Sequence, residues 1–511
     1  MYHEPGAPYD TTDDESDDDS TLSLPDPDDR SLAGGVRRAF GGKRWIVPVI
    51  LFVLTLIIYG LFAFERVKSP SNHTHFVYLA NTFNTMIAAN WDEEAAKKRE
   101  GKHTFELDRQ PPHNNDWASW WELKLKGDDK VYRGIWLDSQ GDGRFKTLPG
   151  KVYVINSSQI VERNRRYFVS FPPMPAVVMM PLTWVYGYKV NDVQFTLFFA
   201  ALNVLLMFLV LRRLSKGGRS GRGRRENLWL TALFALGTAH LWCSVLGQVW
   251  FTALVMGVTF TLLYIYFAID ARHPFLAGLA LAAGFATRTP LVFASIFFFA
   301  FVFFPGGEWR KDDWGEAVKK LTLFCLPCLL IGCTLLWMNH LRFGSLTEFG
   351  HRYLAGGSLA RIKNYGLFNF HFLSKNLSAM LTLIPRLQPD APYIISSKHG
   401  MSIFLTTPAL FYLFLPEDRE SDVDKFWWRL LWVTVAVVAV PALFYQNTGY
   451  EQFGYRFIMD YLPFLIILLA VGRRPLSWLF KACVVAGFVV NGFGAVTFKR
   501  ASQFYRKGFF L

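Results

Sequence analysis

Residues 111–117 read PPHNNDW and residues 171–175 read FPPMP, and both lie in residues 65–191, a segment that separates the first long apolar run from the next. This segment (the arm) is about as long as a small domain. Most of the remaining chain consists of apolar runs with short connections, which offer few groups for chemistry. We therefore expect the arm to carry the functional groups and to lie against the membrane helices.

The composition indicates a membrane protein. The chain has 511 residues, of which 51% are hydrophobic and 17% aromatic, and its apolar runs are long enough to cross roughly 30 Å of hydrocarbon. The net charge is +13, but most cations flank apolar runs, so they indicate orientation in the membrane and no nucleic-acid partner is expected. All five cysteines lie in apolar runs, which predicts small buried side chains.

The beginning of the chain predicts the orientation. Residues 1–36 are rich in Asp, Ser and Pro and cannot bury enough apolar surface to offset the entropy of ordering, so a disordered acidic tail is predicted. The first span, residues 45–64, follows four cations: Arg37, Arg38, Lys43 and Arg44. The positive-inside rule then predicts a cytoplasmic N-terminus and an arm outside the inner (plasma) membrane.

The strongly basic run at residues 212–225 is also expected in the cytoplasm. Two apolar blocks precede it, at about 168–188 and 192–211, and the basic run would lie outside if both crossed the membrane. The first block contains four prolines, which remove helix hydrogen bonds. We predict that this block is interfacial or re-entrant and that residues 192–211 form the second span.

The predicted fold class is a polytopic all-α membrane protein of about eleven spans with an external mixed α/β arm. Residues 192–338 and 401–498 hold the later helices, residues 339–400 form a second external loop, and residues 499–511 form a C-terminal tail. After the first two, the expected spans lie at about 228–246, 250–269, 275–287, 291–304, 321–338, 401–415, 430–446, 458–471 and 482–497. This order leaves the cations of the tail outside, against the positive-inside rule.

The arm is predicted to mix helix and sheet. An amphipathic helix is expected from His75 to about Asn90. From Leu123 onward the apolar period changes to two, with turns at residues 127–129 and 141–143, which predicts a small antiparallel sheet.

The PPHNNDW stretch supplies the candidate general base. Asp116 is its acidic residue, and indole cover from Trp117 and Trp120 would raise its pKa toward a working pH. His113 would orient this carboxylate or bind an acceptor. The structural alternative is that Asp116 caps a short helix starting at Trp117. Glu65, directly after the first span, is the second candidate for the base.

Two near-copies of one hexapeptide, EFGHRY at 348–353 and QFGYRF at 452–457, each lie just outside the end of a predicted outward-running span. A cation beside aromatic rings can hold a lipid phosphate or a sugar face, which makes Arg352, Gln452 and Arg456 candidate substrate ligands. An aromatic belt with snorkelling arginines is the alternative.

Arg288 lies in GFATRTP, residues 284–290, which interrupts an apolar stretch. An arginine at the bilayer centre costs roughly 2.5–3.5 kcal/mol or more. We therefore expect Arg288 at the outer boundary between two short spans, where it can bind a phosphate. A simple turn with an interfacial arginine is the alternative.

The motifs assign neither a metal site nor a nucleotide site. His73 and His75 are spaced for metal binding, but no HExxH-type motif accompanies them, so no metal ligands are assigned. A divalent metal ion stays open as a cofactor. The sequence has no Gly-rich phosphate loop, which disfavours a reaction driven by a cytosolic nucleotide.

This order of features resembles the GT-C membrane glycosyltransferases, the class of the protein mannosyltransferases and lipid A aminoarabinose transferases. The shared features are a cytoplasmic start, one span, a long outer arm that ends in a proline-rich interfacial helix, and a span closed by a double arginine. The PPMP, FATRTP and FGYRF stretches match what is expected of bacterial relatives, and the resemblance covers residues 45 to about 500. It implies a GT-C fold and transfer of a sugar from a polyprenyl-phosphate donor on the outer face. Members of the class usually carry an acidic pair after the first span, as base or metal ligand, whereas here Glu65 stands alone beside Arg66.

The sequence thus predicts a membrane glycosyltransferase whose partners are a lipid-linked sugar donor and membrane lipids. Displacement at the anomeric carbon needs a base on the acceptor hydroxyl, for which Asp116 or Glu65 is the candidate. It also needs positive charge at the departing phosphate, from Arg288 with support from Arg352 and Arg456. A transporter or flippase would instead need ionisable groups inside its spans and repeated halves. A non-catalytic envelope assembly protein would keep the fold without a working carboxylate.

Overall fold

The computed structural model describes residues 45–112, 116–138, 141–354, 359–415, 421–472 and 474–508. The chain divides into two units, residues 1–49 and 50–511. The helices, the sheets and the site described below belong to the second unit, apart from the first residues of helix α2. The acidic tail expected at residues 1–36 and His113 lie outside the described residues.

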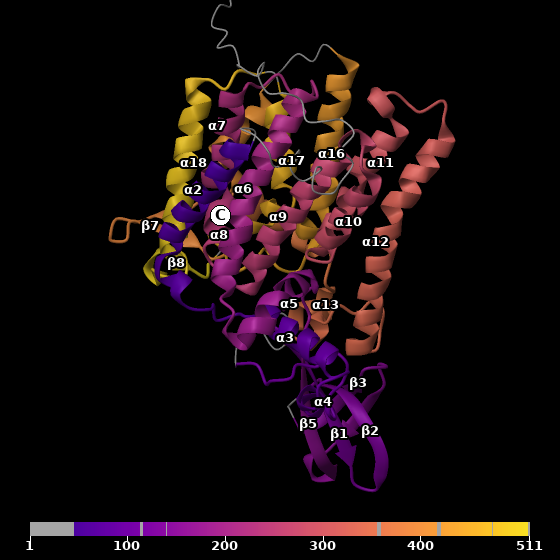
Figure 1. Cartoon of the computed structure of the whole chain (residues 1–511). Helices are drawn as coiled ribbons and strands as arrows, with labels where there is room; N and C mark the ends of the chain where they lie inside the picture. Colours follow the sequence, from indigo (N-terminus) through magenta and orange to yellow (C-terminus); the bar gives the residue numbers. More distant parts are fainter. Residues whose placement is uncertain are drawn as a thin grey trace, which may run out of the picture. The chain divides into compact units, whose positions relative to one another are not determined.

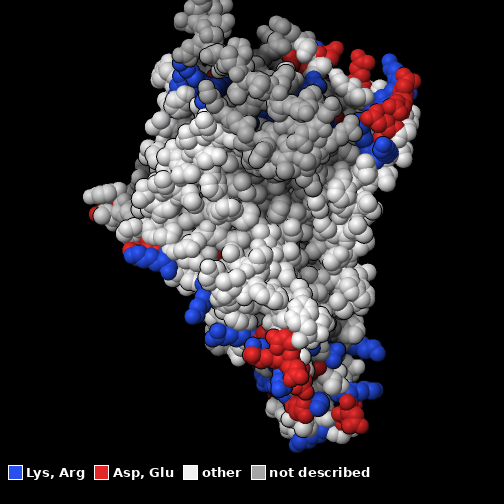
Figure 2. All heavy atoms as spheres, in the orientation of Figure 1, with Lys and Arg blue, Asp and Glu red and all other residues white. Residues whose placement is uncertain are grey.

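Among the described residues, six helices are long and apolar enough to cross a membrane, by length and composition. They are α2 (Ile46–Ala63, continued by η2, Phe64–Lys68), α6 (Asp192–Lys216), α9 (Val249–Ala268), α12 (Trp314–Phe343), α16 (Asp422–Phe444) and α18 (Trp478–Thr497). On the face drawn in Figure 2, most charged side chains lie at the two ends, and the described residues visible between them are mostly uncharged. These features are compatible with a polytopic α-helical membrane protein.

The other apolar helices are shorter. They are α7 (Arg224–Leu236), α8 (Ala239–Ser244), α10 (Pro274–Phe285), η6 (Thr289–Ala294) with α11 (Ser295–Phe303), α15 (Ile403–Thr406) with η10 (Pro408–Phe414), and α17 (Leu462–Val471). They occupy the remaining blocks in which spans were expected. A helix of ten residues is only about 15 Å long. The lengths of these helices therefore do not show whether they cross a membrane. The count of eleven spans stays a prediction.

Helices α6 and α9 form the centre of the bundle (Figure 1), because 72% and 78% of their apolar windows are buried, against 22% and 17% for α2 and α12. The outward face of α12 exposes Leu329, Leu330 and Trp337. Lipid is the expected neighbour of such a face.

The arm contains a helical part and a sheet. Helix α3 (His75–Ala88) packs against α5 (Met174–Tyr186), and α4 (Glu93–Arg99) lies beside α3. The sheet is antiparallel, with the strand order β4-β3-β2-β1-β5. Its strands are β1 (Trp117–Leu125), β2 (Asp128–Trp136), β3 (Gly143–Thr147), β4 (Val152–Ile155) and β5 (Ile160–Val169). At 13 residues with Pro181 inside it, α5 is shorter than a spanning helix.

The expectation that Asp116 caps a helix is wrong. Trp117 begins strand β1, and it pairs with Val169 of β5. Asp116 itself has a φ of 72°, a left-handed conformation that turns the chain into the strand. Pairing between β1 and β5 therefore determines the conformation of this segment. The apolar and aromatic side chains of β1 favour a strand.

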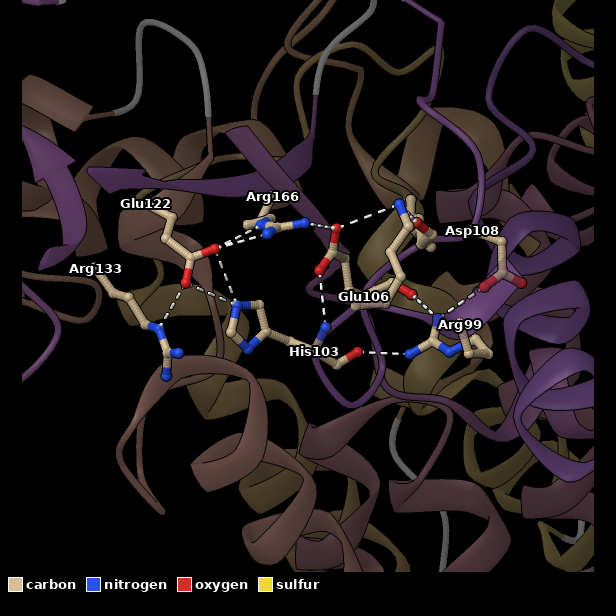
Figure 3. A network of polar contacts seen from close by, with 9 residues as sticks. Arg99, His103, Glu106, Asp108, Glu122, Arg133 and Arg166 are labelled. Atoms are coloured by element: carbon tan, nitrogen blue, oxygen red, sulfur yellow. Dashed lines mark hydrogen bonds and ion pairs between the residues drawn. The ribbon is translucent and has the colours of Figure 1, made fainter. Parts of the chain in front are cut away.

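A network of charged side chains attaches the loop after α4 to the sheet (Figure 3). Glu122 on β1 accepts hydrogen bonds from Arg166 on β5 (2.7 Å) and Arg133 on β2 (3.1 Å). The imidazole of His103 lies 3.3 Å from Glu122, and Arg166 also reaches Glu106 at 3.2 Å. Because Glu106 and His103 belong to the loop, the network fixes the approach of the chain to the site.

Two contacts anchor the sheet to the helices. The indole Nε1 of Trp120 donates to the carbonyl oxygen of Arg342 at the end of α12 (3.0 Å), and the Arg342 guanidinium donates to the carbonyl oxygen of Val169 on β5. The arm is therefore held at the C-terminal end of α12, beside residues 339–400.

The segment predicted as the second external loop, residues 339–400, contains η8 (His351–Tyr353), α13 (Leu359–Tyr365), η9 (Phe370–Phe372), α14 (Leu373–Leu381), β6 (Arg386–Leu387) and β7 (Ile394–Ser397). Strand β8 (Tyr505–Arg506) pairs with β7 in parallel. The segment after α18 thus lies on the same side of the bundle as this loop, where the sequence analysis expected the cations of the tail.

Candidate functional site

A cavity of about 650 Å³ lies between the arm, the ends of several helices and the loops that follow them. It forms where α9 begins, where the chain breaks between α10 and α11, and where α16 ends. The charged residues in its lining are Asp116, Arg288, Arg361, Glu451, Arg456 and Lys499. Its lining also includes the histidine and tyrosine rings of His73, His351, Tyr445 and Tyr450. Three sequence-predicted site residues, Asp116, Arg288 and Arg456, therefore face one space.

The Asp116 carboxylate is held by an indole from another part of the chain. Nε1 of Trp250, at the start of α9, donates a 2.9 Å hydrogen bond to Oδ2 of Asp116. Burial raises the pKa of Asp116, whereas this hydrogen bond and the charge of Arg456 lower it, and the net result is a pKa above the ordinary Asp value. A carboxylate of this kind suits a general base.

The indole cover expected from Trp117 and Trp120 is arranged differently. Trp117 stacks on His75 with ring centroids 3.7 Å apart, and Trp120 bonds to α12. The polar contact with Asp116 comes from Trp250, which sequence reasoning did not single out.

Arg288 lies in the break between α10 and η6 and forms a two-point ion pair. Its Nε and Nη2 donate to Oδ1 and Oδ2 of Asp460 at 2.7 and 2.5 Å. The carboxylate is buried, and the guanidinium lies 5.5 Å from the centroid of the Phe457 ring. Asp460 was missed because it falls in a block expected to span. As an acidic residue within an apolar run, it was itself a signal for a functional position.

Arg456 is a buried cation without an acidic partner among the described residues. It is 6% exposed, and it lines the cavity. Its guanidinium lies 5.4 Å from the ring of Phe251 and 5.5 Å from that of Phe457. No described atom accepts a hydrogen bond from its buried Nε. Because a buried unpaired charge is costly, such a group favours an anionic ligand.

Gln452 belongs to the same hexapeptide but has a different place. It is fully buried and does not line the cavity. Its amide donates to the carbonyl oxygens of His399 (2.6 Å) and Thr448 (2.8 Å), and its oxygen accepts from the backbone N–H of Arg456 (2.9 Å). These bonds hold the loop that presents Arg456, so Gln452 acts on the site through its neighbour.

The structure does not bring two other candidates to the cavity. The Arg352 side chain is 68% exposed and lies 3.6 Å from Glu348, although its neighbours Phe349 and His351 do line the cavity. The Glu65 side chain is 58% exposed and pairs with Lys68 at 2.8 Å, outside the cavity lining.

Glu451 and Lys499 are charged lining residues that sequence reasoning did not assign to a site. The signal for Lys499 was its place among the cations expected on the outer side against the positive-inside rule. Glu451 directly precedes the second hexapeptide, so the sequence could have suggested that it lies near the site. The sequence could not have shown which residues it contacts.

The described residues contain no group of three or more His, Cys, Asp or Glu side chains placed to hold a metal ion. His73 and His75 stack face to face, with centroids 6.3 Å apart and planes 14° apart.

Comparisons of the chain with protein-family models, with curated proteins and with solved structures find no match. The functional argument therefore rests on the cavity.

Proposed function

We propose that the protein is a membrane glycosyltransferase that moves a sugar from a polyprenyl-phosphate donor to an acceptor hydroxyl. The observation that supports this most is one cavity that joins a carboxylate of raised pKa, Asp116, with two arginines, Arg288 and Arg456. A GT-C-like fold with about eleven spans, placed in the inner membrane with a cytoplasmic N-terminus, is part of the proposal.

The reaction assigns one role to each group. The acceptor hydroxyl gives its proton to the Asp116 carboxylate as its oxygen forms a bond to the anomeric carbon. The bond from that carbon to the phosphate oxygen breaks, and polyprenyl phosphate leaves with the electron pair. Arg456 and the unpaired edge of Arg288 stabilise the charge that develops on the phosphate. A single displacement of this kind inverts the anomeric configuration.

The lining also suits a lipid-linked donor. Apolar residues of the helices, among them Phe251 and Leu254 of α9 and Pro441 and Ala442 of α16, line the same cavity as the charged groups. A ligand with a charged head and an apolar chain would match such a lining.

A transporter or flippase of lipid-linked or cell-envelope substrates is the second candidate. The buried Arg288–Asp460 pair favours it, because ionisable groups inside a helical bundle often mark a substrate path. In this reading Arg456 would hold the lipid phosphate and no bond would break. A non-catalytic assembly protein would bind the lipid but would neither transfer the sugar nor move the lipid across the membrane.

The test uses purified full-length protein in lipid nanodiscs and a panel of radiolabelled polyprenyl-phosphate sugars. Wild-type protein should bind a donor and cleave its anomeric bond. Asp116→Asn should bind the same donor and lose roughly two or more orders of magnitude in rate. Asp129→Asn, an exposed carboxylate of the same arm, is the matched control and should keep full activity. Translocation of intact donor in vesicles, without cleavage, would favour the flippase.

A further inference from the structure

A second charged group lies on the cavity, separate from the arginines. The Glu451 carboxylate accepts from Lys398 Nζ at 2.8 Å and from Lys499 Nζ. Glu451 and Lys499 line the cavity, whereas Lys398 is not among the lining residues. Hydrogen bonds and charge from the two lysines outweigh burial and lower the pKa of Glu451, so the carboxylate is ionised at neutral pH.

Segments far apart in the sequence build this group. Lys398 follows β7, and its backbone N–H donates to the carbonyl oxygen of Arg506 in β8 at 2.8 Å. The backbone N–H of Gln452 donates to the carbonyl oxygen of Lys398 at 3.0 Å. Lys499 lies between α18 and β8 with a φ of 62°. A lysine held in the left-handed region at a cavity is a strained position of the kind that collects at ligand sites.

Asp116 is connected to both charged groups. The charge of Arg456 acts on Asp116 directly. Asp116 also bonds to Trp250, whose ring centroid is 4.6 Å from that of His73. Burial lowers the pKa of His73 to about 4, and the nearby charges of Lys499 and Glu451 act on the same ring. The candidate base thus shares one cavity with the arginines and, by way of Trp250 and His73, neighbours the Glu451–Lys499 group.

The two groups suit different ligand chemistry. Arg456 offers a positive charge that forms no ion pair among the described residues, which suits an anion. At the second group the Glu451 carboxylate is paired with two ammonium groups, so it neutralises much of their positive charge and leaves a weaker site for an anion. The side chains of Glu451 and Lys499 remain 25% and 33% exposed. A carboxylate has spare lone pairs and an ammonium has spare protons, so a hydroxyl can donate to the first and accept from the second.

The neighbouring lining adds ring faces. Trp250, His73 and Tyr450 all contribute to the cavity near this group. Flat apolar faces beside alternating hydrogen-bond donors and acceptors match a ring that carries several hydroxyls. We propose that Glu451 and Lys499 form the acceptor subsite and that the acceptor is a sugar unit. This inference rests on the proposed function, which it deepens by naming the class of acceptor.

The experiment measures acceptor and donor separately in full-length protein in nanodiscs. The acceptor probes are methyl glycosides and short oligosaccharides, tested by titration calorimetry and by transfer. The donor readouts are binding of the radiolabelled polyprenyl-phosphate sugar and its slow cleavage by water. Glu451→Gln and Lys499→Gln should raise the Kd and KM for the glycoside tenfold or more, and should change donor binding and cleavage by water less than threefold. Lys499→Arg keeps the charge and should recover part of the affinity.

Lys507→Gln, an exposed cation of the same terminal segment, is the matched control and should behave as wild type. Thermal unfolding of each variant checks that it folds. Glycoside affinity that is unchanged in Lys499→Gln and Glu451→Gln, or wild-type protein that binds none of the glycosides, would overturn the subsite. An equal loss of donor binding would assign the group to the donor instead. If wild-type protein cleaves no donor but binds glycosides through these two residues, the proposed function fails while the sugar subsite stands.

Discussion

Asp116 and Trp250 are 134 positions apart in the chain and are joined by a hydrogen bond of 2.9 Å from the indole to the carboxylate. The indole is an uncharged donor, so it orients the carboxylate and lowers its pKa only in part. Burial outweighs this effect, and the pKa of Asp116 stays above the ordinary value.

The first prediction concerns the dependence of transfer on pH. A base must be ionised, so kcat/KM should fall as the pH drops through the raised pKa of Asp116. Trp250→Phe removes a hydrogen bond that favours the charged form, so the pKa should rise further and the acid limb should move to higher pH. The pH profile of kcat/KM checks this, and a limb that stays in place or moves to lower pH would contradict it.

The second prediction compares the two hexapeptides. Arg456→Gln should weaken binding of a polyprenyl phosphate tenfold or more, because the phosphate loses a buried cation that has no acidic partner among the described residues. Arg352→Gln removes the equivalent arginine of the other copy, which is exposed and outside the cavity lining, and should change binding less than twofold. Equal losses in the two variants would show that the cavity is not the phosphate site.

The third prediction concerns Arg288. Arg288→Lys should weaken transfer measurably but less than Arg288→Ala, because lysine keeps the charge and lacks the planar two-point geometry. Arg288→Ala also leaves the Asp460 carboxylate buried without its partner, which costs about 3–5 kcal/mol in stability. The double variant Arg288→Gln/Asp460→Asn should recover stability in thermal unfolding without recovering phosphate binding. Full binding by the double variant would remove Arg288 from the site.

The fourth prediction concerns the network of the arm. Burial raises the pKa of Glu122, but hydrogen bonds from Arg166 and Arg133 outweigh it and hold the pKa below the ordinary value. The carboxylate therefore stabilises the fold above its unfolded-state pKa, and this contribution is lost as the pH falls through the folded-state pKa. Glu122→Gln should cost the sheet about 1–3 kcal/mol at pH 7.

Hydrogen exchange in the full-length protein measures this cost, with faster exchange expected at the amides of β1 and β5. Glu162→Gln is the control, because its pair with Lys124 is about half exposed and should contribute little. Unchanged exchange in Glu122→Gln would mean that the network does not hold the sheet.

The fifth prediction concerns topology. In a variant without its native cysteines, Lys130→Cys in the arm should react with impermeant thiol reagents added to intact cells. Lys216→Cys at the end of α6 should react only after the cells are opened, because the basic run to which it belongs is expected in the cytoplasm. Labelling of Lys216→Cys in intact cells would reverse the orientation.

Features that depend on local sequence patterns could be predicted from the sequence. Apolar runs marked the helices, a period of two marked the sheet, and the FATRTP break marked the position of Arg288. The two hexapeptides look alike, but Arg456 begins a 3-10 turn whose residues are all buried, whereas the turn that contains Arg352 has no fully buried residue. Arg456 therefore reaches the cavity and Arg352 does not. Local similarity therefore did not determine burial.

The site residues that the sequence analysis did not predict are in contact with residues far away in the chain. Asp460 meets Arg288 after 172 positions, and Trp250 meets Asp116 after 134. No local period records such a pairing. The Glu451–Lys499 contact depends in the same way on the turn after α18, whose left-handed conformation at a lysine gives no signal in the sequence.

The separation between Arg288 and Asp460 also has a consequence for how the protein is made. A ribosome adds about 5–20 residues per second, so the 172 positions between them correspond to roughly 9–34 s of translation. During that interval α10 and α11 have been synthesised with Arg288 between them, while the counter-ion of this arginine has not. Docking of the Arg456–Asp460 turn is then the step of biogenesis that balances this charge.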